Sequence, residues 1–223
     1  MGLQKKSQES YRVLYTDSSG RDTYTAEIVE KKSRFIANVR KVDSEEEAVA
    51  FLEEIRKKHY DARHHCSAFV IGSRGELTRC NDDGEPSGTA GRPMLEVLLG
   101  SEIKGIAVVV TRYFGGTLLG TGGLVRAYSS AVQEVLKLCP TAMMQYGKRL
   151  QVDTDYNGIG KLLYLLGQMG LTQESCEYTD KVCLKVVVPG DKVSHFCKEV
   201  TELTAGRSKV TELEEVFYPV PEI

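Results

Sequence analysis

Two glycine-rich runs in the middle of the chain constrain its fold more than any other feature. The first run spans residues 81–93 and the second spans residues 112–126, with a β-branched segment at 106–111 between them. Each run ends where a helical pattern begins, so each can present backbone N–H groups at the start of a helix. We therefore expect a strand flanked by two loop–helix units, whose loops together form a binding surface.

The first run carries three carboxylates in close succession, Asp82, Asp83 and Glu85. Carboxylate oxygens suit Mg²⁺ or Ca²⁺, but the spacing lacks the further ligands and the distant glutamate of an EF-hand loop. Short Asn and Asp side chains also form turns by bonding to their own backbone. We therefore expect no metal here, and we assign the carboxylates to fixing the loop or holding a ligand.

The helix after this run must begin within 87–92, because Pro93 is tolerated only in a first turn, and it should end at Gly100. Ser87 or Thr89 then supplies the side-chain cap of that helix. The predicted ligand-binding residues of the first run are Asp82, Asp83, Gly84, Glu85, Ser87 and Thr89.

The second run is not a P-loop, because Leu124 follows its last glycine where that motif has Lys and then Ser or Thr. Its glycines allow an anion to approach the backbone closely, with an arginine on either side as counter-charge. The alternative is that the glycine pairs supply positive φ for tight turns. We predict one anion-accepting surface formed by both runs, to which the second contributes Arg112, Tyr113, Gly115, Gly116, Gly122, Gly123 and Arg126.

Two of these residues have a plain structural alternative. Arg126 lies in the expected first turn of a helix, where a cation opposes the helix dipole at a cost of about 0.3–1 kcal/mol. Either a bound anion or one of the carboxylates of the first run compensates that cost. Tyr113, at the end of a strand, either stacks on a base or partner side chain or joins the core.

His64, His65 and Cys66 have the residue types of a zinc site or of a Cys–His nucleophile. Neighbouring residues on a strand face opposite ways, so His64 and Cys66 share one face and His65 takes the other. With Cys80 as a neighbour, a fourth zinc ligand is still missing, and no nucleophile-elbow motif is present. We predict no metal, no cofactor and no assigned catalytic residue.

The remaining pattern predicts a mixed α and β protein. Alternation at 23–29 and 33–42 indicates half-buried strands, and Ser44 with Glu47 forms a capping box before a helix that reaches about His59. A hairpin follows at 66–80, and an amphipathic helix is expected at 124–138. We place a domain boundary at 140–147, which gives domains 1–142 and 143–223.

In the second domain, the apolar patterns of strands and helices follow one another in a regular order. Strands are predicted at 149–155, 171–178, 182–188 and 209–218, with helices at 157–169 and 191–203. This β-α-β-β-α-β order is that of the ferredoxin-like fold, which hosts many functions. The order therefore predicts an architecture and no activity.

Net charge and cysteine content limit which partners and which cellular compartment we expect for the protein. The net charge of −2 gives no overall basic excess, so contact with nucleic acid requires a local patch. No apolar run is long enough for a membrane helix, and the polar N-terminus lacks a signal-peptide core. We expect a cytoplasmic protein with no membrane contact, in which all six cysteines are reduced.

The two glycine-rich runs, together with the segments 27–37 and 62–68, resemble the signature of the IMPACT-type family, whose bacterial members are called YigZ-like. The resemblance ties residues 20–140 to that family, and the rest of the chain looks like the second domain of its bacterial members. It implies an α+β fold in which the first domain is like domain 2 of ribosomal protein S5 and the second is ferredoxin-like. Similar domains occur in elongation factor G.

The resemblance also implies a link to translation control. The eukaryotic IMPACT relative regulates translation by binding the activator of an initiation-factor kinase, a partner that does not transfer to a two-domain bacterial-type chain. We expect a regulatory binding protein, rather than an enzyme, that engages a ribosome, RNA or translation-factor partner, or a small anion or nucleotide, through the two runs. The alternative is an enzyme acting on a phosphorylated or nucleotide ligand, with a divalent metal held by the first run.

Overall fold

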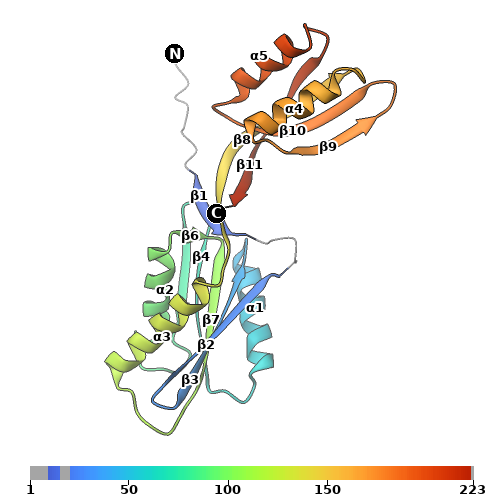
Figure 1. Cartoon of the computed structure of the whole chain (residues 1–223). Coiled ribbons are helices and arrows are strands. Elements are labelled where there is room, and N and C mark those ends of the chain that lie inside the picture. Colours follow the sequence, from blue (N-terminus) through green and yellow to red (C-terminus); the bar gives the residue numbers. More distant parts are fainter. Residues whose placement is uncertain (1–9, 16–20, 222–223) are drawn as a thin grey trace, which may run out of the picture. The chain divides into compact units, whose positions relative to one another are not determined.

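The chain divides into two compact units. The structure is a computed structural model that describes residues 10–15 and 21–221. One unit comprises residues 11–143 with 219–221, and the other comprises residue 10 with 144–218. Figure 1 shows the elements of both units, coloured along the sequence.

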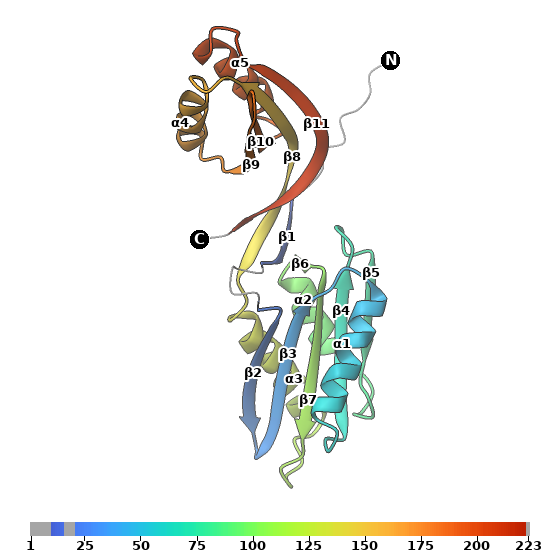
Figure 2. The ribbon, with the colours of Figure 1, turned by 90° about the vertical axis from the view of Figure 1, so that its right-hand side faces the viewer.

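The first unit is built on a five-stranded antiparallel sheet of order β2-β3-β7-β4-β5 (Figure 2). Its central strand β7 is buried except for its last residue, Tyr113, as expected for the apolar segment between the glycine-rich runs. The sheet comprises β2 (Thr23–Glu30), β3 (Ser33–Lys41), β4 (His64–Ile71), β5 (Leu77–Asn81) and β7 (Ile106–Tyr113).

Helices cover both faces of this sheet. Figure 1 shows α2 (Gly91–Gly100) and α3 (Thr121–Leu136) on one side and α1 (Glu45–Lys58) on the other. The side chains of β7 alternate between the two layers, since Val108 and Val110 belong to the core under α2 and α3 and Val109 to the core under α1. Both cores exclude water from apolar side chains, which stabilises the three-layer arrangement.

The start of α1 matches the predicted cap. The Ser44 side chain accepts the N–H of Glu47, and the Glu47 carboxylate accepts the N–H of Asp43. In a capping box the carboxylate accepts the N–H of the cap residue itself, whereas here the Glu47 carboxylate accepts the N–H of Asp43, one residue before Ser44. The capping box is therefore displaced by one position. The predicted helix and its end near His59 are confirmed.

Three details of the first unit differ from the sequence prediction. Helix α3 begins at Thr121, so Gly122 and Gly123 lie in its first turn and have no positive φ; in the other predicted pair Gly116 does have positive φ, as does Gly120. Two short strands, β1 (Tyr11–Leu14) and β6 (Ile103–Lys104), form a parallel pair that the sequence pattern did not predict. Pairing of two such short segments depends on tertiary contacts.

The second unit follows the predicted β-α-β-β-α-β order. Its strands lie in the order β9-β10-β8-β11, and β10 runs antiparallel to both neighbours. Its core gathers Leu150, Leu184 and Phe196 from strands and a helix. The elements are β8 (Thr141–Thr154), α4 (Ile159–Met169), β9 (Gln173–Tyr178), β10 (Val182–Pro189), α5 (Val193–Leu203) and β11 (Lys209–Pro221).

The sequence pattern predicted a strand only from residue 149 onward, after a domain boundary at 140–147. Strand β8 begins at Thr141 and continues without interruption to Thr154, so the division between units at 143/144 falls inside a strand. Pairing with β10 extends as far as Gly147, which faces Pro189, and this pairing explains the extended backbone there. No helix in the described part of the chain is both long and apolar enough to span a membrane.

Candidate functional site

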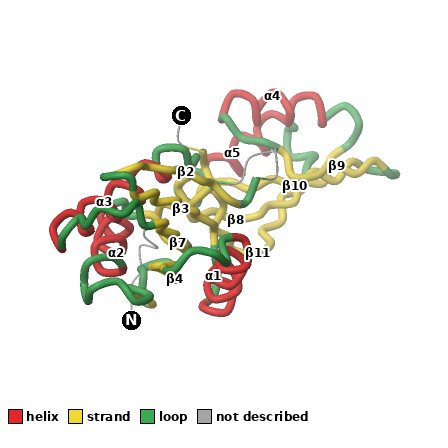
Figure 3. The backbone as a smooth tube through the Cα atoms, turned by 90° about the horizontal axis from the view of Figure 1, so that it is seen from below, coloured by secondary structure: helices red, strands yellow, loops and turns green. Residues whose placement is uncertain are grey.

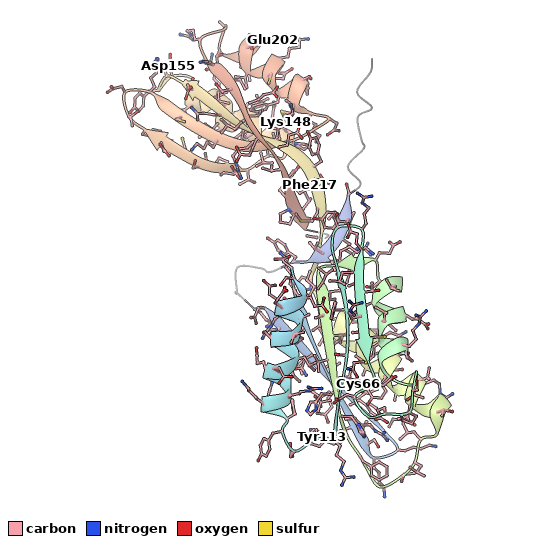
Figure 4. The ribbon with its side chains drawn as sticks, turned by 180° about the vertical axis from the view of Figure 1, so that it is seen from behind. Cys66, Tyr113, Lys148, Asp155, Glu202 and Phe217 are labelled. Carbon is pink, nitrogen blue, oxygen red and sulfur yellow. The ribbon has the colours of Figure 1, made fainter. Side chains whose placement is uncertain are left out.

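Both glycine-rich runs lie at one end of the first sheet, which we call the loop end. Strand register defines it: Tyr113 at the end of β7 faces Arg34 at the start of β3, and His64 at the start of β4 faces Arg112. Asn81 ends β5 at the same end. Figure 3 shows the chain from below, with loops in green between the strands and helices, and Figure 4 shows Cys66 and Tyr113 towards this end. The N-termini of α2 and α3 both follow from these loops.

Asp82 fixes the first run and caps α2. One carboxylate oxygen accepts the N–H groups of Ala90 and Gly91 at 3.0 and 2.8 Å, and the other accepts the N–H of Gly88 at 2.8 Å. Burial by itself raises the pKa of this carboxyl, but the three backbone hydrogen bonds outweigh burial and hold the pKa below its usual value. The cap is therefore Asp82, and the prediction that Ser87 or Thr89 caps the helix is wrong.

The two predicted caps have other environments. The Thr89 hydroxyl donates to the carbonyl of Pro86 at 2.6 Å, which closes a turn inside the run, and Ser87 is exposed. Gly84 has φ +84°, and its backbone passes so close to the His64 ring that an added Cβ would lie 3.4 Å from Nδ1. These residues shape the loop rather than the helix end.

Asp83 ties the first run to α1 and β4. Its carboxylate accepts the backbone N–H of His65 at 2.6 Å and Nη2 of Arg56 at 2.9 Å. Its carbonyl oxygen lies 2.9 Å from Nδ1 of His64. Both histidines considered for zinc therefore serve the loop, and among the residues described no three His, Cys, Asp or Glu side chains group as a metal site would require.

Glu85 lies at the centre of a buried polar network. Its Oε1 accepts Nη1 of Arg112 at 2.7 Å and the hydroxyl of Tyr128 at 2.8 Å, and Glu85 and Arg112 are only 8% and 7% exposed. Cys66 Sγ lies 3.3 Å from the Tyr128 hydroxyl. Its thiol also donates to the carbonyl of Asp82 at 3.0 Å. Burial raises the pKa of both Cys66 and Tyr128, so both stay protonated.

Arg112, expected to face an anion, is thus paired inside the protein. Its guanidinium also lies over the rings of Phe35 and Phe114, with Cζ 5.4 and 5.6 Å from the ring centres. The buried Nε atom of Arg112 has no hydrogen-bond partner in the described structure. The carboxylates considered for Arg126 are instead taken by Arg112, Arg56 and the backbone.

Tyr113 joins the loop end to the end of α1. Its hydroxyl donates to Asp61 at 2.8 Å and lies 3.1 Å from Nδ1 of His59. Burial, with the nearby Asp61 carboxylate, raises the pKa of this hydroxyl. The guanidinium of Arg34 covers the ring at 5.5 Å. Of the two interpretations weighed for Tyr113, these contacts favour a structural role.

The second run packs against the turn between β2 and β3. An added Cβ on Gly115 would lie 2.0 Å from the carbonyl carbon of Lys32, so only glycine fits there. The N–H of Gly115 donates to the Ser33 hydroxyl at 3.2 Å. No side chain caps the start of α3, and Arg126, in its second turn, is exposed, with no ion pair among the residues described.

The geometry adds residues that pattern reading missed. Lys31 and Lys32 form the two-residue turn touched by the second run, and both have positive φ, 45° and 65°. Tyr60 and Arg63 follow α1 and lie exposed at the same end. Lys31, Lys32 and Arg63 lie in the segments 27–37 and 62–68 that resemble the family signature, but only strand register shows that these residues lie beside the glycine-rich runs.

Comparisons with known proteins agree on one family. Residues 31–136 match the Impact N-terminal domain and residues 152–207 match a domain of unknown function, DUF1949. The chain is 42% identical over 191 residues to the IMPACT family member YvyE of Bacillus subtilis, covering 86% of this chain and 88% of that protein. It is 40% identical over 187 residues to YigZ of Escherichia coli, covering 83% and 92%. A crystal structure of a hypothetical protein is similar, with a TM-score of 0.58 at 36% identity over 93% of this chain and 98% of that chain.

Proposed function

We propose that this chain, which belongs to the IMPACT family, is a regulatory binding protein linked to translation. It engages a ribosomal, RNA or protein partner through its two glycine-rich loops, in the cytoplasm. The observation that carries this proposal is the division of charge at the loop end: the carboxylates bond inward, whereas Arg126 and the uncapped start of α3 face outward.

The architecture supports the same proposal by analogy. We assign the first unit to the fold of domain 2 of ribosomal protein S5 and the second to the ferredoxin-like fold, as the family resemblance implies. The strand order β9-β10-β8-β11 with two helices supports the second assignment. Both folds recur in elongation factor G, so the pair suits a protein that faces the ribosome; a fold alone carries no function.

The hydrogen-bond donors exposed at the loop end suit an anionic partner. Backbone N–H groups at a helix start and an arginine side chain are both donors that phosphate and carboxylate oxygens accept. The enzymatic alternative gains no support from the carboxylates, because Asp82, Asp83 and Glu85 already accept hydrogen bonds from the protein itself. A metal bound there would have to displace those donors.

Sedimentation with ribosomes tests the proposal. The full-length chain should pellet with purified ribosomes, and Arg126→Ala should reduce the pelleted fraction severalfold without lowering the melting temperature, because the side chain is exposed. Arg74→Ala is the matched control, since Arg74 is an exposed arginine in the turn between β4 and β5, at the opposite end of the sheet. Absence of the chain from the ribosomal pellet, at low salt as well as moderate salt, would refute the link to translation.

A further inference from the structure

The loop end carries more cations than the two glycine-rich runs supply. Lys31, Lys32, Arg63 and Arg126 are all exposed there, and none has an ion pair among the residues that the structure describes. They come from three separate places in the sequence: the β2–β3 turn, the start of β4 and the start of α3. Their grouping is a product of the fold.

Almost all acidic side chains at this end form hydrogen bonds or ion pairs within the protein. Asp82 and Asp83 bond to backbone N–H groups, Glu85 is buried against Arg112, and Asp61 accepts from Tyr113. Glu30 is the exposed exception. No Asp or Glu occurs between Glu102 and Glu134, the stretch that contains the second run and the first half of α3. The outward charge at the loop end is therefore positive.

Two helix dipoles add to this charge. Helices α2 and α3 both begin at the loop end, and the first turn of neither contains an acidic residue. Asp82 neutralises the start of α2, but the start of α3 has no side-chain cap. An uncapped helix start carries a partial positive charge and N–H groups without partners inside the helix.

Large apolar side chains stand exposed among these cations. Tyr60 is 85% exposed, Leu118 is 82% exposed and Phe114 is 57% exposed, all in loops at this end of the sheet. Exposed aromatic rings beside cations are the combination with which proteins hold single-stranded nucleic acid, because bases stack on the rings while the cations follow the phosphates. A single strand offers phosphates and unpaired bases along its whole length, which suits both the cations and the rings.

The β2–β3 turn is unfavourable for the residues it contains. Both central residues of this two-residue hairpin turn have positive φ, a geometry in which Asn and Gly are usual, yet both are lysines. Left-handed backbone is unfavourable for a residue with a side chain, because its Cβ crowds the following carbonyl oxygen. The turn thus presents two charges in a conformation that stability alone does not favour.

We infer that the loop end binds single-stranded RNA, with Lys31, Lys32, Arg63 and Arg126 on the phosphates and Phe114 and Tyr60 stacking on unpaired bases. This inference rests on the proposed function for its link to translation and deepens it by naming the class of partner. Because recognition works through phosphates and stacking, the surface accepts many sequences, and its affinity falls steeply as salt rises.

The test is a titration of full-length protein into a labelled oligouridine of about 12 nucleotides, followed by fluorescence anisotropy at several salt concentrations. The double substitution Lys31→Asn and Lys32→Gly removes two charges and installs the favoured turn, so folding should be kept or improved. It should weaken RNA binding and lower the slope of log affinity against log salt by about 1.4, the share of two phosphate contacts on a single strand.

Phe114→Ala separates stacking from charge. It should weaken binding by about tenfold, in the range of one base–aromatic stack, and leave the salt slope unchanged. Arg74→Ala and Tyr164→Ala are the controls, because Arg74 is exposed at the opposite end of the first sheet and Tyr164 is exposed on α4 of the second unit, and both variants should bind as the wild type does.

Three outcomes would overturn the inference: no binding at low salt, equal binding by the wild type and both loop-end variants, or polyglutamate bound as tightly as RNA. The last would assign the surface to an acidic protein. These results are distinct from failure of the proposed function. A chain that pellets with ribosomes but fails this titration keeps its link to translation, and a chain with the reverse behaviour keeps its RNA surface and loses that link.

Discussion

Asp82 organises the first glycine-rich run, because its two oxygens gather three backbone N–H groups and so cap α2 from outside the helix. We predict that Asp82→Ala lowers the free energy of unfolding by about 1–2 kcal/mol, the usual loss for a helix cap. Asp82→Asn keeps one oxygen acceptor and should lose less. Urea unfolding of the three proteins measures both effects, and equal stability of wild type and Asp82→Ala would contradict the assigned role.

The Asp82 carboxylate also makes the stability of the folded protein depend on pH. The pKa of Asp82 in the folded protein is lowered, so the folded state holds the proton less tightly than the unfolded chain does. Its contribution is therefore fully present above the unfolded pKa and is lost as pH falls through the lowered folded pKa. Asp82→Asn should consequently show a flatter decline in melting temperature on acidification than the wild type, measured by thermal unfolding from pH about 6 to about 2.

Thiol reactivity should follow burial. Cys66 and Cys139 are buried, and burial raises the pKa of both thiols, that of Cys139 to about 12. Cys80 is exposed. At about pH 8 a thiol reagent should modify Cys80 rapidly and the two buried thiols only on unfolding, because the thiolate is the reactive form. In denaturant all six cysteines should react; a smaller number would indicate a disulfide or a bound metal.

At the residue scale the sequence indicated the carboxylates but not their partners. A turn interpretation of Asp82 and Asp83 followed from local side-chain chemistry, which acts over a few residues. Glu85 meets Arg112, 27 residues away, and Tyr128, 43 residues away, so these contacts depend on how three elements pack. For the same reason the sequence did not predict that Lys31, Lys32 and Arg63 belong to the site, because strand register alone brings these residues there.

At the scale of elements, two glycines of the second run provide a matched pair. Gly115→Ala would place its Cβ 2.0 Å from the backbone of Lys32, whereas a Cβ on Gly122 would meet nothing closer than 3.7 Å, an Arg126 nitrogen. We predict that Gly115→Ala costs about 1–3 kcal/mol of unfolding free energy, as overpacking does. Gly122→Ala should be neutral or stabilising by up to about 1 kcal/mol, because Gly122 lies in α3. Equal effects in denaturant unfolding would contradict this loop geometry.

Element boundaries show where sequence reasoning stops. The periodicity of apolar residues predicted α1, α3 and all the elements of the second unit, since that pattern reports the buried face directly. It missed the start of α3 because Gly122 and Gly123 favour loops as readily as a first helical turn. It missed the part of β8 before residue 149 because composition does not mark a strand there, and only Gly147 and Lys148 of that part pair with β10.

At the scale of the whole molecule, the two units have separate cores. The core of the second unit is drawn from residues 150–210 alone, so we predict that a fragment of residues 145–223 folds by itself. A domain of about 80 residues has a small core, so its stability should be modest. Circular dichroism should show a cooperative thermal transition for the fragment. A non-cooperative melt would show that the first residues of β8 are needed for folding.

The central claim is that a component of the translation machinery binds at the loop end of the first unit. A photo-crosslinking amino acid in place of Leu118, the 82% exposed residue of the second run, tests this claim most directly in growing cells. The same amino acid in place of Tyr164, 66% exposed on α4 of the second unit, is the control. The account predicts adducts with ribosomal RNA, ribosomal proteins or translation factors from position 118 and few from 164. Adducts from 164 alone, or from 118 to proteins unrelated to translation, would contradict it.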